Sequence, residues 1–297
     1  MKIRVCVPSY RRPEVLTLRY LPFAAVYVDK SEEGVYRACN PGAEIIACPE
    51  GIQGNLCRVR NYIMRLEFAN GADVVAILDD DYSGLFYWEG GKEHNVSSDE
   101  FIPFLVRYSL LAREWGARFW GVNVNYDRQC YRENTPFSTI SYIGGPFQVF
   151  LRGNECFYDE ALPLKEDYDM TLQQLRRHRI ALRLNKYFYR VKQSEQVGGC
   201  ATYRNLDKER EQLETLRRKW GGADCPVRLF RSLAQGREIQ KRRFHRLQSS
   251  HQISDQRCLK HCPCEIPHGY FFADVNCKHA VYIDAFPPQK RGETWNG

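Results

Sequence analysis

The segment Val74-Val-Ala-Ile-Leu-Asp-Asp-Asp-Tyr82 joins five consecutive apolar residues to three consecutive aspartates. An uninterrupted apolar run of this length is typical of a central parallel strand that is covered on both faces. Ligands of open α/β sheets bind at the carboxyl ends of such strands. Clustered carboxylates repel one another unless a cation neutralises them, so the aspartates predict a site for Mg²⁺ or Mn²⁺ that is shared with substrate phosphates. The alternative is an acidic turn in solvent.

The segments on either side of this run alternate between strand and helix patterns. Strands are expected at residues 3–7, 25–28, 44–48, 74–78 and 119–124 and within 139–151, and helices at residues 32–39, 58–69, 98–116, 169–179 and 206–220. This order of elements favours an α/β fold with an open, mostly parallel sheet and flanking helices.

The composition excludes several classes of protein. The chain has 297 residues, of which 43% are hydrophobic and 27% charged, which is ordinary for a globular protein and rules out wholesale disorder. No apolar run reaches the roughly 18 residues that a membrane span needs, and the first residues show a strand pattern rather than a signal peptide. We therefore expect a cytoplasmic protein without a membrane partner.

The charge divides the chain near a boundary pattern at residues 221–226. Residues 225–297 contain twelve lysines and arginines against six acids, so they carry +6 of the net charge of +7. We therefore expect a main domain at residues 1–222 and a small basic, Cys/His-rich region at residues 223–297. The basic run Lys241, Arg242, Arg243 and Arg246 predicts binding to a polyanion such as DNA. A solvated basic surface is the alternative.

The cysteines fall into two groups. Those at positions 6, 39, 48, 57, 130 and 156 have the surroundings of small core residues. Between Cys258 and His279, in contrast, seven cysteines and histidines occur within 22 residues. In a reducing compartment such a cluster favours a metal over disulfides. One interpretation is structural zinc on Cys258, Cys262, Cys264 and His268, and the other is reduced thiols packed in a small lobe.

Four motifs in a fixed order resemble the glycosyltransferases of the GT-A fold. They are Pro8-Ser-Tyr-Arg-Arg-Pro13, Asp29 after the second strand, Gly54-Asn-Leu-Cys-Arg-Val-Arg-Asn61, and Asp79-Asp-Asp81. The resemblance implies a nucleotide-sugar site lined by Pro8, Ser9, Tyr10, Arg11, Asp29, Arg58, Arg60, Asn61, Asp79 and Asp80, with the metal on Asp79 and Asp81. Arg58 and Arg60 remain alternatives for pairing with phosphate, to which an arginine fork binds bidentately. The structural alternative is that both are surface arginines on the polar face of an amphipathic helix.

A second acidic cluster, Lys165-Glu-Asp-Tyr-Asp169, opens a basic helix pattern. It resembles the Glu-Asp motif of inverting GT-A enzymes, in which a carboxylate takes the proton from the acceptor hydroxyl. By this resemblance Asp167 is the expected base, Glu166 is the second candidate, and Lys165 is expected to keep Asp167 ionised. Helix capping by these acids is the structural alternative.

Among GT-A enzymes, residues 2–220 resemble the phage TET-associated glycosyltransferases more closely. The resemblance rests on the motifs above and on the aromatic segment Phe86-Tyr-Trp-Glu89. This resemblance implies metal-dependent transfer of a sugar, with glucose expected, from a UDP-sugar to a hydroxymethylated pyrimidine of the 5-hydroxymethylcytosine type in phage DNA within the host cytoplasm. Two alternatives remain open. One is a GT-A enzyme acting on a saccharide or lipid carrier, and the other is a nucleic-acid-binding protein without catalysis.

Overall fold

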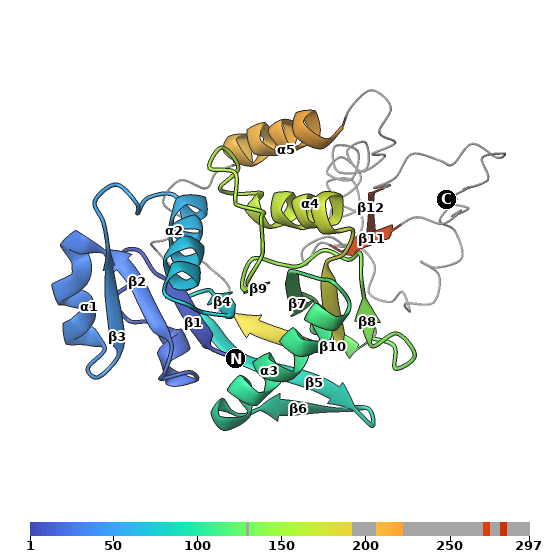
Figure 1. Ribbon diagram of the computed structural model, residues 1–297, viewed down its shortest axis with the longest axis horizontal. Coiled ribbons are helices and arrows are strands. Elements are labelled where there is room, and N and C mark those ends of the chain that lie inside the picture. Colours follow the sequence, from blue (N-terminus) through green and yellow to red (C-terminus); the bar gives the residue numbers. More distant parts are fainter. Residues whose placement is uncertain (129–130, 192–205, 222–269, 274–279, 284–297) are drawn as a thin grey trace, which may run out of the picture. The chain divides into compact units, whose positions relative to one another are not determined.

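Strands and helices alternate through the first half of the chain, as the sequence predicts. The computed structural model describes residues 1–128, 131–191, 206–221, 270–273 and 280–283 (Figure 1). The strands are β1 Ile3–Pro8, β2 Ala25–Asp29, β3 Glu44–Cys48, β4 Val74–Leu78, β5 Tyr82–Glu89, β6 Lys92–Val96, β7 Phe119–Asn123, β8 Phe137–Ser138, β9 Phe147–Leu151, β10 Leu182–Val191, β11 Tyr270–Ala273 and β12 Ala280–Ile283. The helices are η1 Leu16–Arg19, η2 Lys30–Glu32, α1 Glu33–Cys39, α2 Leu56–Ala69, α3 Ser98–Glu114, α4 Glu166–His178 and α5 Leu206–Trp220.

One ten-stranded sheet organises the described part of residues 1–216. Its strand order is β3-β2-β1-β4-β9-β7-β10-β5-β6, and β8 pairs with β10. The first four strands are parallel to one another, as are β7 and β10. Strand β9 runs antiparallel to both β4 and β7, and β5 runs antiparallel to β10 and β6. The predicted α/β class with flanking helices is confirmed.

Strand pairing brings two distant turns together at the carboxyl edge of the sheet. Leu78 ends β4 and pairs with Phe147, which begins β9. The glycine turn before Phe147 therefore lies beside the aspartates that follow Leu78. The backbone N–H of Asp79 donates to the carbonyl of Pro146 at 3.3 Å. Acids and glycines that are more than 60 residues apart in sequence thus share one edge.

Helix α3 shows how local sequence sets the elements around this sheet. Ser97 and Glu100 form a reciprocal capping box at its N-terminus, which satisfies two backbone donors. Its buried side chains include Phe101, Phe104 and Leu105. The helix packs against β1 and β7, and α2 packs against β1 and β4. The flanking helices thereby fix the positions of the strand ends that carry the acidic residues.

The structure differs from the sequence predictions in several elements. Helix α4 begins at Glu166, three residues earlier than the helix pattern at 169–179 suggested. The hairpin of β5 and β6 and the long strand β10 were not predicted as strands, because β6 is polar and largely exposed and β10 mixes charged with aromatic residues. Their pairing partners, rather than their own patterns, make them strands.

The buried-cysteine prediction holds for four residues: Cys6, Cys48, Cys57 and Cys156 are buried, whereas Cys39 is exposed and Cys130 lies outside the described residues. Within the described segments, no helix has the length and apolar character needed to cross a bilayer.

Residue contacts divide the chain into two units, Met1–Leu216 and Arg217–Gly297. Most of the second unit lies outside the described residues. This holds for every predicted DNA-binding and zinc-binding residue: Lys241, Arg242, Arg243, Arg246, Cys258, Cys262, Cys264 and His268.

Candidate active site

The backbone of the aspartate triplet is held by one buried threonine. The Thr17 hydroxyl donates to the carbonyl of Asp79 at 2.6 Å and accepts from the N–H of Tyr82 at 3.2 Å. The N–H of Thr17 donates to the carbonyl of Asp80 at 3.2 Å. Because the Thr17 side chain is fully buried, these three hydrogen bonds fix the path of the turn and so the directions of its carboxylates.

The middle aspartate joins the triplet to the N-terminal motif. Ser9 donates to Asp80 at 2.7 Å, and Arg12 forms an ion pair with it at 3.0 Å. The Tyr36 hydroxyl contacts both the Ser9 hydroxyl, at 2.9 Å, and the Arg12 N–H, at 3.0 Å. Burial raises the pKa of Asp80, while the Ser9 hydrogen bond and the Arg12 charge oppose that rise. Two of the four motifs that carry the GT-A resemblance, the N-terminal motif and the aspartate triplet, therefore form one hydrogen-bonded unit.

The third aspartate is the least compensated of the three. Asp81 is buried, and no ion pair to its carboxylate occurs among the described residues. Burial, and then the charges of Asp79 and Asp80, raise its pKa to about 7. The charge of Arg12 opposes this rise only in part. A buried carboxylate whose neighbouring charges are mostly negative is costly unless a cation reaches it.

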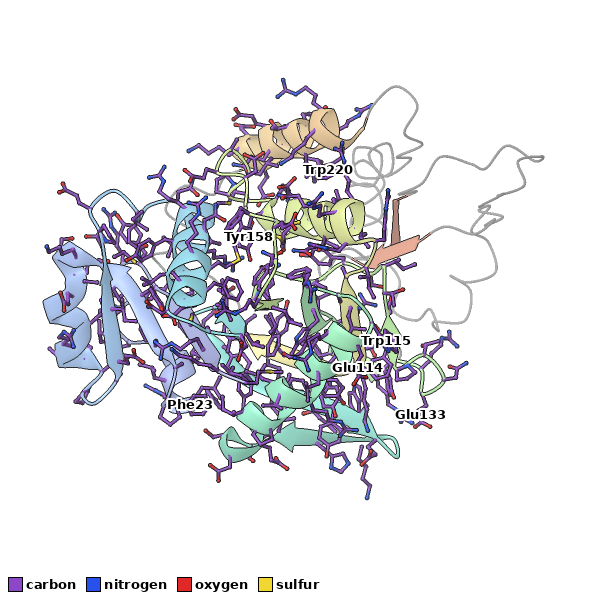
Figure 2. The ribbon with its side chains drawn as sticks, viewed as in Figure 1. Phe23, Glu114, Trp115, Glu133, Tyr158 and Trp220 are labelled. Carbon is purple, nitrogen blue, oxygen red and sulfur yellow. The ribbon has the colours of Figure 1, made fainter. Side chains whose placement is uncertain are left out.

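Arg60 connects the triplet to the second acidic cluster. Its side chain is 1% exposed, so it does not lie on the polar face of the helix that its spacing suggested. The guanidinium contacts Asp79 at 2.8 Å, Glu166 at 3.3 Å and the carbonyl of Gly145 at 3.0 Å. It also lies 5.6 Å above the ring of Tyr158, the residue labelled in Figure 2. Arg60 therefore positions two acids that are far apart in sequence, Asp79 and Glu166.

The second acidic cluster provides two carboxyl groups with different surroundings. Glu166 is buried, and burial followed by the charge of Asp167 raises its pKa to about 8. Asp167 is only half-buried and accepts hydrogen bonds from the Tyr142 hydroxyl, the N–H of Gly145 at 3.2 Å and the N–H of Tyr168 at 2.8 Å. When two carboxyls share a site, the proton remains on one of them. Here burial and the charge of Asp167 favour the protonated form of Glu166 near neutral pH.

Lys165 is not the partner of Asp167. Its ammonium pairs with Glu209 of α5 at 2.5 Å, and among the described residues no ion pair joins it to Asp167. The role of Lys165 in keeping Asp167 ionised stays a prediction. The helix also has no side-chain cap at its N-terminus, because Lys165 occupies that position. The acids in the first turn are therefore oriented by Gly145, Tyr142 and Arg60 and not by capping.

The charge balance of the cluster fits a divalent cation. The described cluster contains more acidic than basic side chains. The guanidinium groups of Arg12 and Arg60 face five carboxyl groups, those of Asp79, Asp80, Asp81, Glu166 and Asp167. In the part of the chain that the structure describes, no three side chains of His, Cys, Asp or Glu form a complete metal cage. Mg²⁺ and Mn²⁺ sites that use one or two carboxylates complete their shell with water and substrate phosphates. Asp79 and Asp81 fit that description.

The glycine turn approaches the cluster too closely for a side chain. A Cβ atom on Gly144 would lie 2.4 Å from a Val124 methyl carbon and 2.7 Å from the Tyr189 hydroxyl. A Cβ atom on Gly145 would lie 3.2 Å from the Glu166 carboxylate. Glycine is therefore required at position 144 by packing, and its backbone is available to the site.

Gly144→Ala is expected to destabilise the fold by about 1–3 kcal/mol, the usual cost of overpacking a closed site. Gly34→Ala is the matched control, because Gly34 lies in α1 with no atom within 4 Å of the added Cβ. This control should stabilise the protein by about 0.5–1 kcal/mol through the helix preference for alanine. Urea denaturation of both variants measures the difference, and equal midpoints would show that the turn is not tightly packed.

The remaining predicted site residues lie at the ends of β1 and β2 and on α2. Pro8 ends β1, Arg11 stacks on Tyr10 at 4.9 Å, and the Asp29 carboxylate accepts from the N–H of Ser31 at 2.9 Å. Arg58 is 40% exposed and pairs with Glu160 at 3.0 Å, whereas the Asn61 side chain is bonded to the backbone of Tyr158. Among the described residues, none of these six side chains has a hydrogen bond or ion pair to the acids of the cluster.

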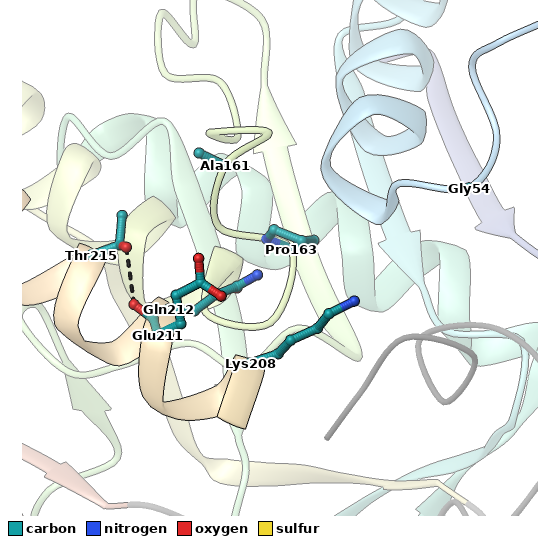
Figure 3. A pocket seen from close by; sticks show the side chains of 7 residues that line it. All are labelled: Gly54, Ala161, Pro163, Lys208, Glu211, Gln212 and Thr215. Carbon is teal, nitrogen blue, oxygen red and sulfur yellow. Dashed lines mark hydrogen bonds between the residues drawn. The ribbon is translucent and has the colours of Figure 1, made fainter. Parts of the chain in front are cut away.

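A separate pocket lies near α5 and is drawn in Figure 3. Its lining residues are Gly54, Ala161, Pro163, Lys208, Glu211, Gln212 and Thr215. The Thr215 hydroxyl donates to the carbonyl of Glu211 at 2.9 Å. The acids of the cluster do not line this pocket, so we do not assign a reaction to it.

Three residues of the cluster lie outside the predicted site: Arg12, Tyr142 and Tyr189. Arg12 belongs to the N-terminal motif, so the sequence could have identified it, beside Arg11, as a partner for the acids. The two tyrosines carry no local signal, because the chain has 18 tyrosines and nothing in their neighbourhoods distinguishes these two.

Comparison with known proteins gives one family and several structural neighbours. A family model described as TET-Associated Glycosyltransferase matches residues 4–199. S. aureus TarS 1–349 in complex with UDP is 13% identical, with 64% of this chain and 59% of that chain covered and a TM-score of 0.40. Glucosyl-3-phosphoglycerate synthase from Mycobacterium tuberculosis, in complex with Mn²⁺, UDP and glucosyl-3-phosphoglycerate, is 13% identical, with 73% and 79% covered and a TM-score of 0.42. This chain thus spans 59% of the length of the TarS fragment. No curated protein matches the sequence.

Proposed function

Since the chain belongs to the TET-associated glycosyltransferase family, we propose that it transfers a sugar, with glucose as the expected unit, from a UDP-sugar to a hydroxymethylated pyrimidine in DNA. The observation that carries the proposal is the cluster of five carboxyl groups around Arg12 and Arg60 at the carboxyl edge of the sheet. Such an edge is where α/β folds bind ligands. A cluster this acidic suits a cation-bound diphosphate better than a bare anion.

The donor would lie along the ends of β1 and β4. Under this proposal Pro8, Ser9, Tyr10 and Arg11 line the nucleotide pocket and Asp29 contacts the uridine. Asp80, oriented by Ser9 and Arg12, faces the ribose. Asp79 and Asp81 would hold Mn²⁺ or Mg²⁺, which would neutralise the charge that develops on the departing diphosphate. Arg60 keeps Asp79 in place through its ion pair.

The acceptor would be activated by Asp167. Attack of a hydroxymethyl oxygen on the anomeric carbon forms the new C–O bond as the bond to the diphosphate breaks, and the electron pair of that bond leaves with UDP. The proton of the hydroxyl passes to the Asp167 carboxylate, which is more accessible than the buried Glu166. A single displacement of this kind inverts the anomeric configuration.

The DNA acceptor is supported by the family and by charge. Residues 225–297 carry +6 of the net charge of +7, and Lys241, Arg242, Arg243 and Arg246 form a run within them. Contacts between such residues and phosphates give sequence-independent, salt-dependent affinity for DNA. The body of the protein would thus bind the sugar donor, and the basic region would bind the acceptor strand.

The proposal predicts donor turnover that depends on a divalent cation. The full-length protein is incubated with UDP-glucose and Mn²⁺, first alone and then with DNA containing 5-hydroxymethylcytosine. We expect slow release of UDP without acceptor, and faster release with a mass gain of one hexose per modified base when the DNA is present. Full activity in excess EDTA would contradict the metal assignment. UDP release that is stimulated only by a saccharide or lipid carrier would move the acceptor to that class.

A further inference from the structure

Tyr189 lies beside the glycine turn of the acidic cluster without belonging to any motif. It is the third residue from the end of β10, and 6% of it is exposed. Its hydroxyl oxygen would be 2.7 Å from a Cβ atom on Gly144, so the glycine turn passes directly beside it. The strand pairing opposite Leu85 holds the backbone in place. The phenol therefore has a fixed position next to the glycine turn.

The surroundings of this phenol are acidic on two sides. After burial, the charges that raise its pKa most are those of Asp79, Asp167 and Asp81, in that order. The acids therefore lie near the hydroxyl, which stays protonated and can donate a hydrogen bond. Asp79 and Asp81 belong to the triplet after β4, whereas Asp167 belongs to α4. Gly145, the next residue of the glycine turn beside Tyr189, donates its N–H to Asp167 at 3.2 Å and accepts from Arg60, which pairs with Asp79. The turn beside the Tyr189 hydroxyl is therefore linked to both acidic groups.

The Tyr189 hydroxyl has no hydrogen-bonding partner among the described residues, unlike the hydroxyls of Tyr142 and Tyr187. The Tyr142 hydroxyl donates to Asp167, and the Tyr187 hydroxyl accepts from Tyr108 at 3.0 Å. No residue that the structure describes forms a hydrogen bond with the Tyr189 hydroxyl. The hydroxyl can therefore take a hydrogen-bonding partner from a bound molecule. A ligand group that binds in the cluster provides one.

We infer that Tyr189 forms a hydrogen bond with the sugar unit of the donor and positions it for transfer; this inference rests on the proposed function. The diphosphate is assigned to the side of Asp79 and Asp81, and the attacking oxygen to the side of Asp167. In a displacement at the anomeric carbon the sugar must lie between the leaving and the attacking oxygens. The glycine turn that contacts both groups passes beside the Tyr189 hydroxyl, and a phenol can both donate to and accept from a sugar hydroxyl.

The test separates sugar contacts from nucleotide contacts. Binding of UDP and of UDP-glucose, each with Mn²⁺, is measured by calorimetry for the wild type, Tyr189→Phe and Tyr187→Phe. Tyr187→Phe is the matched control, because it removes a hydroxyl two residues away that bonds to Tyr108. We expect Tyr189→Phe to weaken UDP-glucose binding about fivefold to tenfold, the factor that one net hydrogen bond provides. Its UDP binding should stay within about twofold of the wild type, as should both affinities of the control.

Each alternative outcome of this binding experiment contradicts one specific part of the inference. If Tyr189→Phe weakens UDP and UDP-glucose equally, the hydroxyl contacts the diphosphate or orders the site, and the sugar assignment is wrong. If it changes neither affinity, Tyr189 does not contact the donor. If the wild type binds neither ligand, the proposed function fails and the inference fails with it, a result that is distinguishable because it appears without any substitution.

Discussion

Replacing Asp81 with asparagine is expected to lower sugar transfer by roughly 10³-fold or more, because a cation bound at the reacting phosphate contributes several kcal/mol to transition-state stabilisation. Asp81 has no ion pair among the described residues and lies against two other acids. The assay is hexose transfer to hydroxymethylated DNA at saturating Mn²⁺. Asp80→Asn should act mainly on donor affinity, because Asp80 is already paired with Arg12.

The loss in Asp81→Asn is expected without unfolding. Burial and neighbouring charges raise the pKa of the folded Asp81 to about 7, whereas an unfolded aspartate titrates near about 3.9. The folded state then binds more protons between these values, so the stability of the metal-free wild type falls as the pH rises from about 4 to about 7. Asparagine does not ionise, so the Tm of the variant at pH 8 should equal or exceed that of the wild type. A variant that keeps its transfer activity would remove Asp81 from the metal site.

Asp167→Asn is expected to lower the rate of transfer by about 10²-fold or more, the usual contribution of a general base. The substitution removes the charge that accepts the proton of the hydroxymethyl group but keeps the shape of the side chain. Affinity for UDP-glucose should change little, because the groups assigned to the nucleotide and the metal are on β1, β2 and β4. Steady-state kinetics with DNA as the varied substrate measure the loss in kcat.

Glu166→Gln is the matched control for this prediction. The pKa of Glu166 is raised to about 8, so at pH 7 the side chain is largely the neutral acid, which glutamine imitates. Its oxygen can still accept from Arg60, and we expect near-normal transfer. The opposite pattern, with Glu166→Gln inactive and Asp167→Asn active, would move the base to Glu166. Normal rates in both variants would contradict an inverting mechanism and favour a retaining one.

The sequence by itself determined the parallel half of the sheet and the order of its motifs. The apolar run that became β4 is continuous, lies between Asp73 and Asp79 and is buried throughout, so burial on both faces could be read locally. The three aspartates were placed at the carboxyl edge for the same reason. Glu166 and Asp167 could be recognised as a pair because they are adjacent in sequence. In each of these predictions, the residues that determine the local structure lie within a few positions of one another in sequence.

Only the tertiary structure decided how the motifs meet. Helical spacing placed Arg60 on a polar face, yet its guanidinium is buried because Asp79 and Glu166, which are 19 and 106 residues away in sequence, compensate its charge there. Tyr189 enters the site because β10 pairs with β5 and β7, a non-local pairing that its mixed sequence does not encode. A buried charge or hydroxyl is stabilised by whichever partner the fold brings within hydrogen-bonding distance, and that partner is set by long-range packing rather than by local pattern.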